Sequence, residues 1–257
     1  MSGGTPQMSS LKRTLAMLDA VIADGGLSSV SQLARQIGMP SATAHRQVTT
    51  LVSEAYLTAS GGGRYVAGAR LLALLHRLDE KQVIANVAAP ILHELAARVR
   101  SVVQLGTFEN DMVTYRIKTG RGASALFTRA GMQLEAYCSG IGKVLLANLP
   151  EAEREAYLAG GPFVSLTDRT IVDPERLREE LDSVRAQGFA IDDEEVAPGL
   201  CCMAVPLRRS DGNVLAAISV SQAVSSRRRL DDASLQTLLK EAARAIELTS
   251  SRGDAAP

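Results

Sequence analysis

The sequence has few cysteines and no long apolar run, and both shortages exclude classes of protein. Three cysteines in 257 residues, two of them adjacent, cannot form a disulfide framework, so we expect a reducing, cytoplasmic location. The three histidines and three cysteines have no ligand spacing, and we expect no metal and no cofactor. Apolar stretches are short and interrupted by charged residues, which argues against a membrane span and a membrane partner.

The chain also lacks an excess of either charge, with 28 basic and 28 acidic residues. The balance is uneven along the chain. Residues 1–78 hold seven Lys or Arg against three acids, a net charge of +4, which leaves 21 basic and 25 acidic residues, or −4, for the remainder. A modestly basic segment joined to an acidic one is compatible with a DNA-binding domain attached to a domain that does not touch DNA.

Residues 29–48 have the pattern of a helix-turn-helix. Ser29 and Gln32 have the spacing of a capping box at a helix start. Gly38 follows the last residue of the apolar period, where a left-handed helix end needs glycine, and Pro40 is placed to open a second helix. An ordinary helical hairpin with a solvated polar face is the alternative.

The outward face of the second helix carries short polar and basic side chains, which suit entry into the major groove. Strand candidates at 57–59 and 65–67 flank a glycine-rich tip that ends in Arg64, as expected of a wing that touches phosphate. A first helix upstream begins near two basic residues. The expected DNA-binding residues are Ser41, Thr43, His45, Arg46, Thr49, Arg64, Lys12 and Arg13.

The length predicts two domains with short disordered ends at residues 1–8 and 251–257. Residues 1–7 lack the basic start and apolar core of a secretory signal. We expect the DNA-binding domain at 9–70, a linker and dimerisation helix at 71–89, and a second domain at 90–250. The linker is leucine-rich, and it either docks on its own domain or pairs with a second copy, which we favour. Pro90 should kink or restart the helix.

The second domain alternates strands and helices. Strands are predicted at 102–108, 112–117, 189–192, 202–208 and 214–221, and helices at 139–148, 150–159, 173–188 and 235–246. This order predicts an α+β domain with an antiparallel sheet.

Both halves together resemble the IclR-type (isocitrate lyase regulator) family of bacterial transcription factors. The resemblance covers nearly the whole chain in unbroken order. It rests on Leu33-Ala34, Gly38-Met39-Pro40-Ser41, Thr43, His45-Arg46, Leu51, Tyr56-Leu57 and 65–68, and then on 139–147, Thr170-Ile171, Gly188-Phe189-Ala190, 192–195, Gly199, Ala204-Val205-Pro206 and 217–221.

The resemblance implies a winged helix-turn-helix, a dimerising linker helix and a GAF-like effector-binding domain for a small acidic metabolite. The positions that match the family's pocket are Leu126, Gly140, Ile141, Asp192, Cys202, Ser219 and Ser221. Free N–H groups at a helix start by Gly140 and Ile141 would attract a carboxylate. Where the family commonly has Pro-Leu-His, this chain has Glu135-Ala136-Tyr137. We therefore expect Tyr137 to form part of the pocket and to favour an aromatic acid from a catabolic pathway.

The expected partners are double-stranded operator DNA, a small carboxylate effector, and further copies of the chain as a homodimer or dimer of dimers. RNA polymerase would be a partner of an activator. We do not expect an enzyme. Two alternatives remain open: a GAF-domain thiol enzyme that uses Cys138, Cys201 and Cys202, and an architectural DNA-binding protein without an effector.

Overall fold

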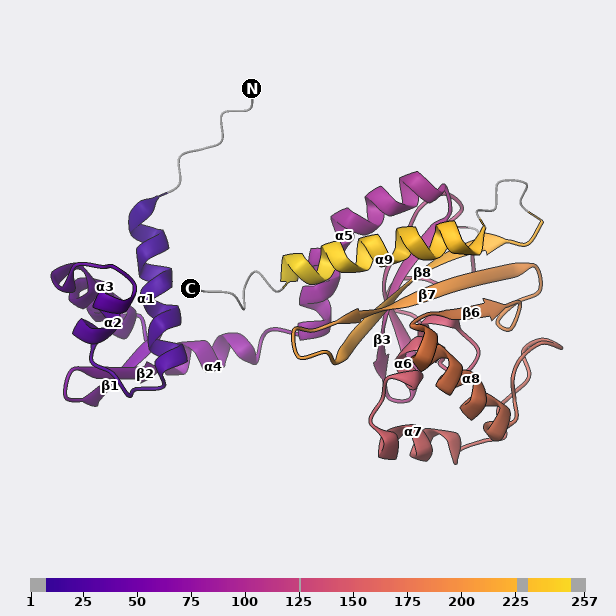
Figure 1. The fold of residues 1–257 in the computed structure, drawn as a ribbon, viewed down its shortest axis with the longest axis horizontal. Coiled ribbons are helices and arrows are strands. Elements are labelled where there is room, and N and C mark those ends of the chain that lie inside the picture. Colours follow the sequence, from indigo (N-terminus) through magenta and orange to yellow (C-terminus); the bar gives the residue numbers. More distant parts are fainter. Residues whose placement is uncertain (1–7, 125, 226–230, 251–257) are drawn as a thin grey trace, which may run out of the picture. The chain divides into compact units, whose positions relative to one another are not determined.

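The computed structural model describes residues 8–124, 126–225 and 231–250, and it divides the chain into two compact units between Asp79 and Glu80 (Figure 1). The expected disordered ends lie outside the described residues, except for Met8. The elements of the first unit are α1 Ser9–Asp24, α2 Val30–Gln36, α3 Ser41–Ser53, β1 Leu57–Gly61, β2 Arg64–Ala67 and α4 Ala69–Leu75.

The first unit is a winged helix-turn-helix. Buried Met17, Ala34, Ala44 and Val48 join the three helices in one core. The strands β1 and β2 pair antiparallel, and Val30 N donates a 3.0 Å hydrogen bond to Gly63 O. This bond ties the tip of the β-hairpin to the start of α2.

The second unit contains α5 Glu80–Val99, β3 Val102–Glu109, β4 Met112–Thr119, β5 Gln133–Glu135, α6 Gly140–Ala147, α7 Glu151–Leu158, α8 Pro174–Gln187, β6 Ala190–Asp193, β7 Leu200–Arg208, β8 Val214–Ala223 and α9 Asp232–Ser250. Its six strands form an antiparallel sheet in the order β5-β4-β3-β8-β7-β6. The α+β fold with an antiparallel sheet is confirmed.

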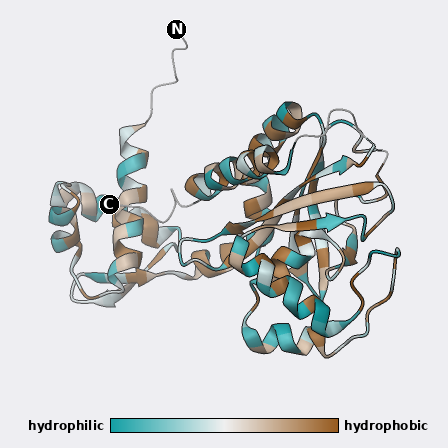
Figure 2. Cartoon of the chain, turned by 45° about the vertical axis from the view of Figure 1, so that its right-hand side comes forward, coloured by the Kyte–Doolittle hydropathy of each residue, from teal (hydrophilic) through white to brown (hydrophobic). Residues whose placement is uncertain are grey.

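Helices cover both faces of this sheet. On one face α5 and α9 pack on residues such as Val205 and Ile218, and on the other α6 and α8 pack on Ala204 and Ala217. Because side chains alternate along a strand, Ser219 and Ser221 of β8 face the α6 side. In Figure 2, α7 and α8 are largely hydrophilic, in keeping with helices that bury only one stripe.

The linker differs from the expectation. Two helices replace the single linker helix at 71–89, and the predicted boundary after residue 89 falls inside α5. Helix α5 continues through Pro90, which is exposed, because its opposite face is anchored by buried residues such as Ala88 and Leu92. From residue 84 onward this helix therefore belongs to the core of its own domain. Leu72, Leu75 and Leu78 remain exposed in the single chain.

The first turn of α5 is held by two hairpins of the sheet. Lys81 Nζ donates to Phe108 O at 2.5 Å and lies 3.4 Å from Glu109 Oε1, at the turn between β3 and β4. Glu80 forms an ion pair with Arg209, just after β7. The residues that open the second unit are thus fixed to the ends of its central strands.

Candidate functional site

The α2–α3 hairpin is built by the local signals that its sequence carries. Gln32 Oε1 accepts a 2.8 Å hydrogen bond from Ser29 N, which satisfies a donor at the start of α2. Gly38 has φ 64°, the left-handed conformation that glycine adopts without strain, and Pro40 precedes the first residue of α3. These features place α3 as the second helix of the motif.

Most of the expected DNA-binding residues lie on one exposed surface of α3. Ser41, His45, Arg46 and Thr49 are exposed, and Thr43 is half-buried. His45 Nε2 lies 3.2 Å from the hydroxyl of Ser31 on α2, and that hydroxyl is 3.1 Å from Ser41 Oγ.

The remaining expected residues are also exposed. Arg64 follows the turn of the β1–β2 hairpin, and its Nε is 3.4 Å from Gly61 O, so the side chain folds over the tip. Lys12 and Arg13 occupy the first turns of α1. Basic side chains therefore lie on three elements of this domain, which suits contacts to phosphate.

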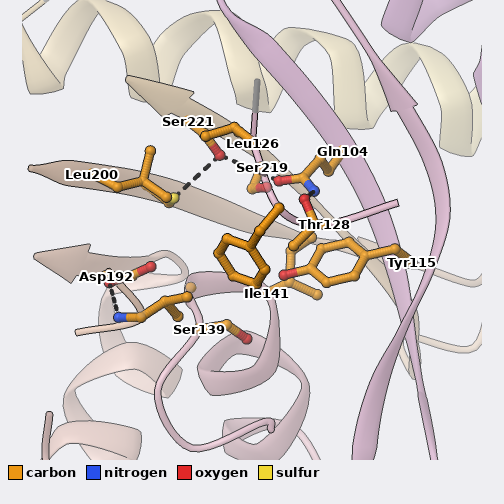
Figure 3. A pocket seen from close by; sticks show the side chains of 14 residues that line it. Gln104, Tyr115, Leu126, Thr128, Ser139, Ile141, Asp192, Leu200, Ser219 and Ser221 are labelled. Carbon is orange, nitrogen blue, oxygen red and sulfur yellow. Dashed lines mark hydrogen bonds between the residues drawn. The ribbon is translucent and has the colours of Figure 1, made fainter. Parts of the chain in front are cut away.

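The second unit contains a cavity between the start of α6 and strands β3, β4, β6, β7 and β8 (Figure 3). The cavity has a volume of about 20 Å³. The cavity is therefore narrow. The lining residues are Gln104, Tyr115, Leu126, Phe127, Thr128, Ser139, Gly140, Ile141, Asp192, Val196, Leu200, Cys202, Ser219 and Ser221.

The seven positions implied by the family resemblance all line this cavity, but Tyr137 does not. Its hydroxyl donates a 2.7 Å hydrogen bond to Val164 O, and its ring stacks on Phe163 with a centroid distance of 4.7 Å. These contacts turn the side chain into the α6–α8 core. The expectation that Tyr137 forms part of the pocket is wrong, because tertiary partners outside the α6 segment set its direction.

A chain of hydrogen bonds joins residues of the cavity wall. Cys202 Sγ donates to Ser221 Oγ at 3.2 Å, and Ser221 Oγ donates to Gln104 Oε1 at 3.3 Å. Gln104 Nε2 in turn donates to Thr128 Oγ1 at 2.9 Å. Figure 3 shows Gln104 and Tyr115 on one side of the cavity and Asp192 on the other.

The start of α6 contributes backbone donors to the cavity. Ser139 caps the helix by accepting from Gly142 N at 3.1 Å. A Cβ at Gly142 would lie 2.0 Å from Ala136 O, so only glycine allows this close approach. The N–H groups of Gly140 and Ile141 precede the first intrahelical hydrogen bonds, and the helix dipole makes this end attractive to an anion.

The opposite wall is a turn held by buried charges. Asp192 Oδ1 accepts from Glu195 N at 2.8 Å, and burial raises the pKa of Asp192 to about 6. Lys143 of α6 is 1% exposed, and its Nζ bonds Glu195 Oε1 and, at 3.1 Å, both Ile191 O and Glu180 Oε1. Burial raises the pKa of Glu195 to about 7, although Lys143 opposes the shift. Lys143 thus binds α6 to the 191–195 turn.

Sequence reasoning missed several residues of the cavity, including Gln104, Tyr115 and Thr128. Gln104 and Tyr115 lie on strands predicted only from their apolar pattern. A buried glutamine within the apolar run 102–108 was the available signal, since a buried amide needs partners.

The cysteines do not have the properties of catalytic thiols. All three are buried, and burial raises the pKa of Cys138 to about 12 and that of Cys202 well above its usual value. A thiol that stays protonated at neutral pH is a poor nucleophile. In the part of the chain that the structure describes, no group of three or more His, Cys, Asp or Glu side chains could hold a metal ion. Within the same ranges, none of the helices combines the length and the mean hydropathy that a bilayer span requires.

Comparison with known proteins finds two family models along the chain. The helix-turn-helix domain of IclR matches residues 10–61, and the C-terminal domain of the bacterial transcriptional regulator IclR matches residues 75–248. The chain is 31% identical over 242 residues to the Pca regulon regulatory protein of Pseudomonas putida, which covers 93% of this chain and 83% of the relative.

Two further similarities span most of the chain. The transcriptional regulator XynR of Escherichia coli is 32% identical over 232 residues, 90% of this chain and 91% of the relative. A solved structure of an IclR homologue from Microbacterium hydrocarbonoxydans, complexed with 4-hydroxybenzoate, is 28% identical with a TM-score of 0.61. The match covers 94% of this chain and 98% of the homologue's chain.

Proposed function

Since this chain belongs to the IclR family of bacterial transcriptional regulators, we propose that a small aromatic carboxylate controls its binding to operator DNA. The first unit is the DNA-binding domain and the second is the effector-binding domain. The relatives are named as regulators, and the chain is a regulator rather than an enzyme.

The observation that carries the effector proposal is the composition of the narrow cavity. It combines backbone donors at the start of α6 with the buried hydroxyls of Ser219 and Ser221. A carboxylate accepts hydrogen bonds from both kinds of donor. Leu126, Ile141 and Leu200 supply apolar surface for the rest of the ligand, as in most small-molecule sites.

The aromatic class is supported by one relative, an IclR homologue whose structure was solved with 4-hydroxybenzoate bound. Half-exposed Phe127 lines the cavity, so its ring can stack on or make way for a ring of the ligand.

On DNA, we propose that Ser41, Thr43, His45, Arg46 and Thr49 enter the major groove, while Arg64, Lys12 and Arg13 contact the backbone. The exposed leucines of the linker, Leu72, Leu75 and Leu78, would be covered by a second copy of the chain. A symmetric dimer requires a pseudo-palindromic operator with half-sites about 10 bp, or a multiple, apart. A dimer of dimers would extend the same contacts.

The test is calorimetric titration of the full chain with benzoate, 4-hydroxybenzoate, pyruvate and glyoxylate. Binding of an aromatic acid, with a matching change in operator affinity, is the expected result. Binding of pyruvate or glyoxylate alone would contradict the aromatic class. No binding of any carboxylate, with intact operator binding, would favour an architectural protein instead. A monomer by light scattering at micromolar concentration would contradict the dimer.

A further inference from the structure

The effector cavity lacks a cation of its own. None of its lining residues within the described ranges is Lys, Arg or His, and the one carboxylic acid among them is Asp192. An anionic ligand would therefore meet neutral donors and one carboxyl group that repels it when ionised. The dipole at the start of α6 favours an anion over a neutral molecule of the same shape, and a positive charge close to the cavity would strengthen this preference.

Lys118 lies directly behind one wall of the cavity. It is on β4, opposite Gln104 in the register of β3 and β4. Its Nζ donates to Leu126 O at 2.9 Å and to Thr128 O, and both of these residues line the cavity. Gln104 holds the same segment through Thr128 Oγ1. The 126–128 wall is thus fixed from β3 and β4 by one amide and one ammonium group.

The charge of Lys118 is not neutralised locally. Its ammonium group has no carboxylate within 4.0 Å in the parts of the chain that the structure describes, and its two acceptors are carbonyl oxygens. Lys118 is half-buried, and desolvation lowers its pKa. The potential of an unpaired charge extends further through a protein interior than through water. The cavity is next to this charge, behind a single segment of chain.

We infer that Lys118 makes the cavity select carboxylates, by supplying positive potential from behind the wall that it also holds in place. This inference rests on the proposed function of the cavity. Lys118 does not line the cavity, so it is a positioning and specificity-determining residue. Its two roles predict different results for different substitutions: Lys118→Met removes charge and donor, Lys118→Gln keeps a donor without charge, and Lys118→Arg keeps both.

The test compares benzoate with benzamide, a neutral analogue of similar shape, by calorimetric titration of the full-length protein. Wild type should prefer benzoate. Lys118→Met and Lys118→Gln should each weaken benzoate binding about tenfold, the order expected when one unit charge that acts through the protein interior is lost. Benzamide affinity should change less than about threefold in Lys118→Gln, because no charge is involved. Lys118→Arg should keep the preference, and Lys240→Met, an exposed lysine on α9, is the matched control.

The outcomes separate this inference from the proposed function. If Lys118→Gln weakens benzoate and benzamide equally, or keeps the wild-type preference, Lys118 only supports the wall and the inference is overturned. If wild type does not bind benzoate in preference to benzamide, the proposed function fails and the inference fails with it. Thermal unfolding of each variant shows that it is folded, and Lys118→Gln and Lys118→Arg decide the result if Lys118→Met is not.

Discussion

Ser221 lies in the middle of the hydrogen-bond chain in the cavity wall, and its replacement should lower both the free energy of unfolding and the affinity for the effector. Ser221→Ala removes the donor to Gln104 Oε1 and the acceptor of Cys202 Sγ. Gln104 is 4% exposed, so bulk water cannot replace the hydrogen bond that its carbonyl oxygen loses. A buried group left without its partner costs about 1–3 kcal/mol. A loss of about 2 kcal/mol in the free energy of unfolding should lower the Tm of a domain of this size by about 4–8 °C.

Ser219 provides a matched control on the same strand and the same face. It is as buried as Ser221, but its hydroxyl makes no hydrogen bond to other residues described in the structure. Ser219→Ala should therefore stay within about 0.5 kcal/mol of the wild-type free energy of unfolding. The Ser219→Ala variant should differ from wild type only when effector is present, because the Ser219 hydroxyl is free to donate to the ligand.

Ser219→Ala should weaken effector binding by about 1–3 kcal/mol, since a charged acceptor loses a donor. Ser221→Ala should weaken it as well, because it breaks the hydrogen-bond chain that holds Gln104 in the cavity wall. Differential scanning calorimetry measures the Tm, and isothermal titration measures effector affinity. Operator affinity without effector should match wild type for both variants. Equal stability of Ser219→Ala and Ser221→Ala would refute the hydrogen-bond chain. A double variant that responds at wild-type effector concentrations would place the effector elsewhere.

Three further predictions concern the DNA surface, the buried charges and the link between the domains. Arg46→Ala should weaken operator binding by about 1–3 kcal/mol if Arg46 reads a base edge, and less if it touches phosphate. Unchanged affinity in a gel-shift titration would remove Arg46 from the interface. Burial raises the pKa of Glu195 to about 7, so the folded state holds its proton to higher pH than the unfolded state. Urea unfolding should therefore show wild type losing stability relative to Glu195→Gln as pH rises from about 5 to about 8, and parallel curves would contradict this. Lys81→Met, which frees the first turn of α5 from the β3–β4 turn, should reduce the effector-induced change in operator affinity while leaving effector affinity near wild type. If the ratio of operator affinities with and without saturating effector is the same as in wild type, the contact of Lys81 with the β3–β4 turn does not couple effector binding to operator binding.

Elements with strong local signals were predictable from the sequence. The turn between β3 and β4 has Asn110 and Asp111 at φ 51° and 63°, a conformation that these residues tolerate. Helix α8 begins at the Asp173 cap, which accepts from Arg176 N at 2.9 Å, and ends before Gly188 at φ 76°. Each of these boundaries depends on residues adjacent in sequence, so the pattern alone identifies it.

Elements that depend on distant partners were not predictable in this way. The three residues of β5 form a strand because they pair with β4, and their sequence has no strand pattern of its own. Helix α5 crosses Pro90 because its other face packs on α9 and the sheet. Tertiary packing outweighs the local preference against proline in a helix interior.

In the candidate site too, local patterns are visible in the sequence and distant partners are not, as two lysines show. Lys143 and Lys118 each follow an unremarkable local pattern, one in a helix and one in a strand. What distinguishes them is their partners. Lys143 bonds Glu195, 52 residues away, while the hydrogen bonds of Lys118 to described residues are to carbonyl oxygens of the cavity wall. The charge of Lys143 is therefore paired with carboxylates at the junction of two walls, whereas we infer that the charge of Lys118 acts on the ligand. Which lysine can act on a ligand is decided by the acids that the fold brings near it.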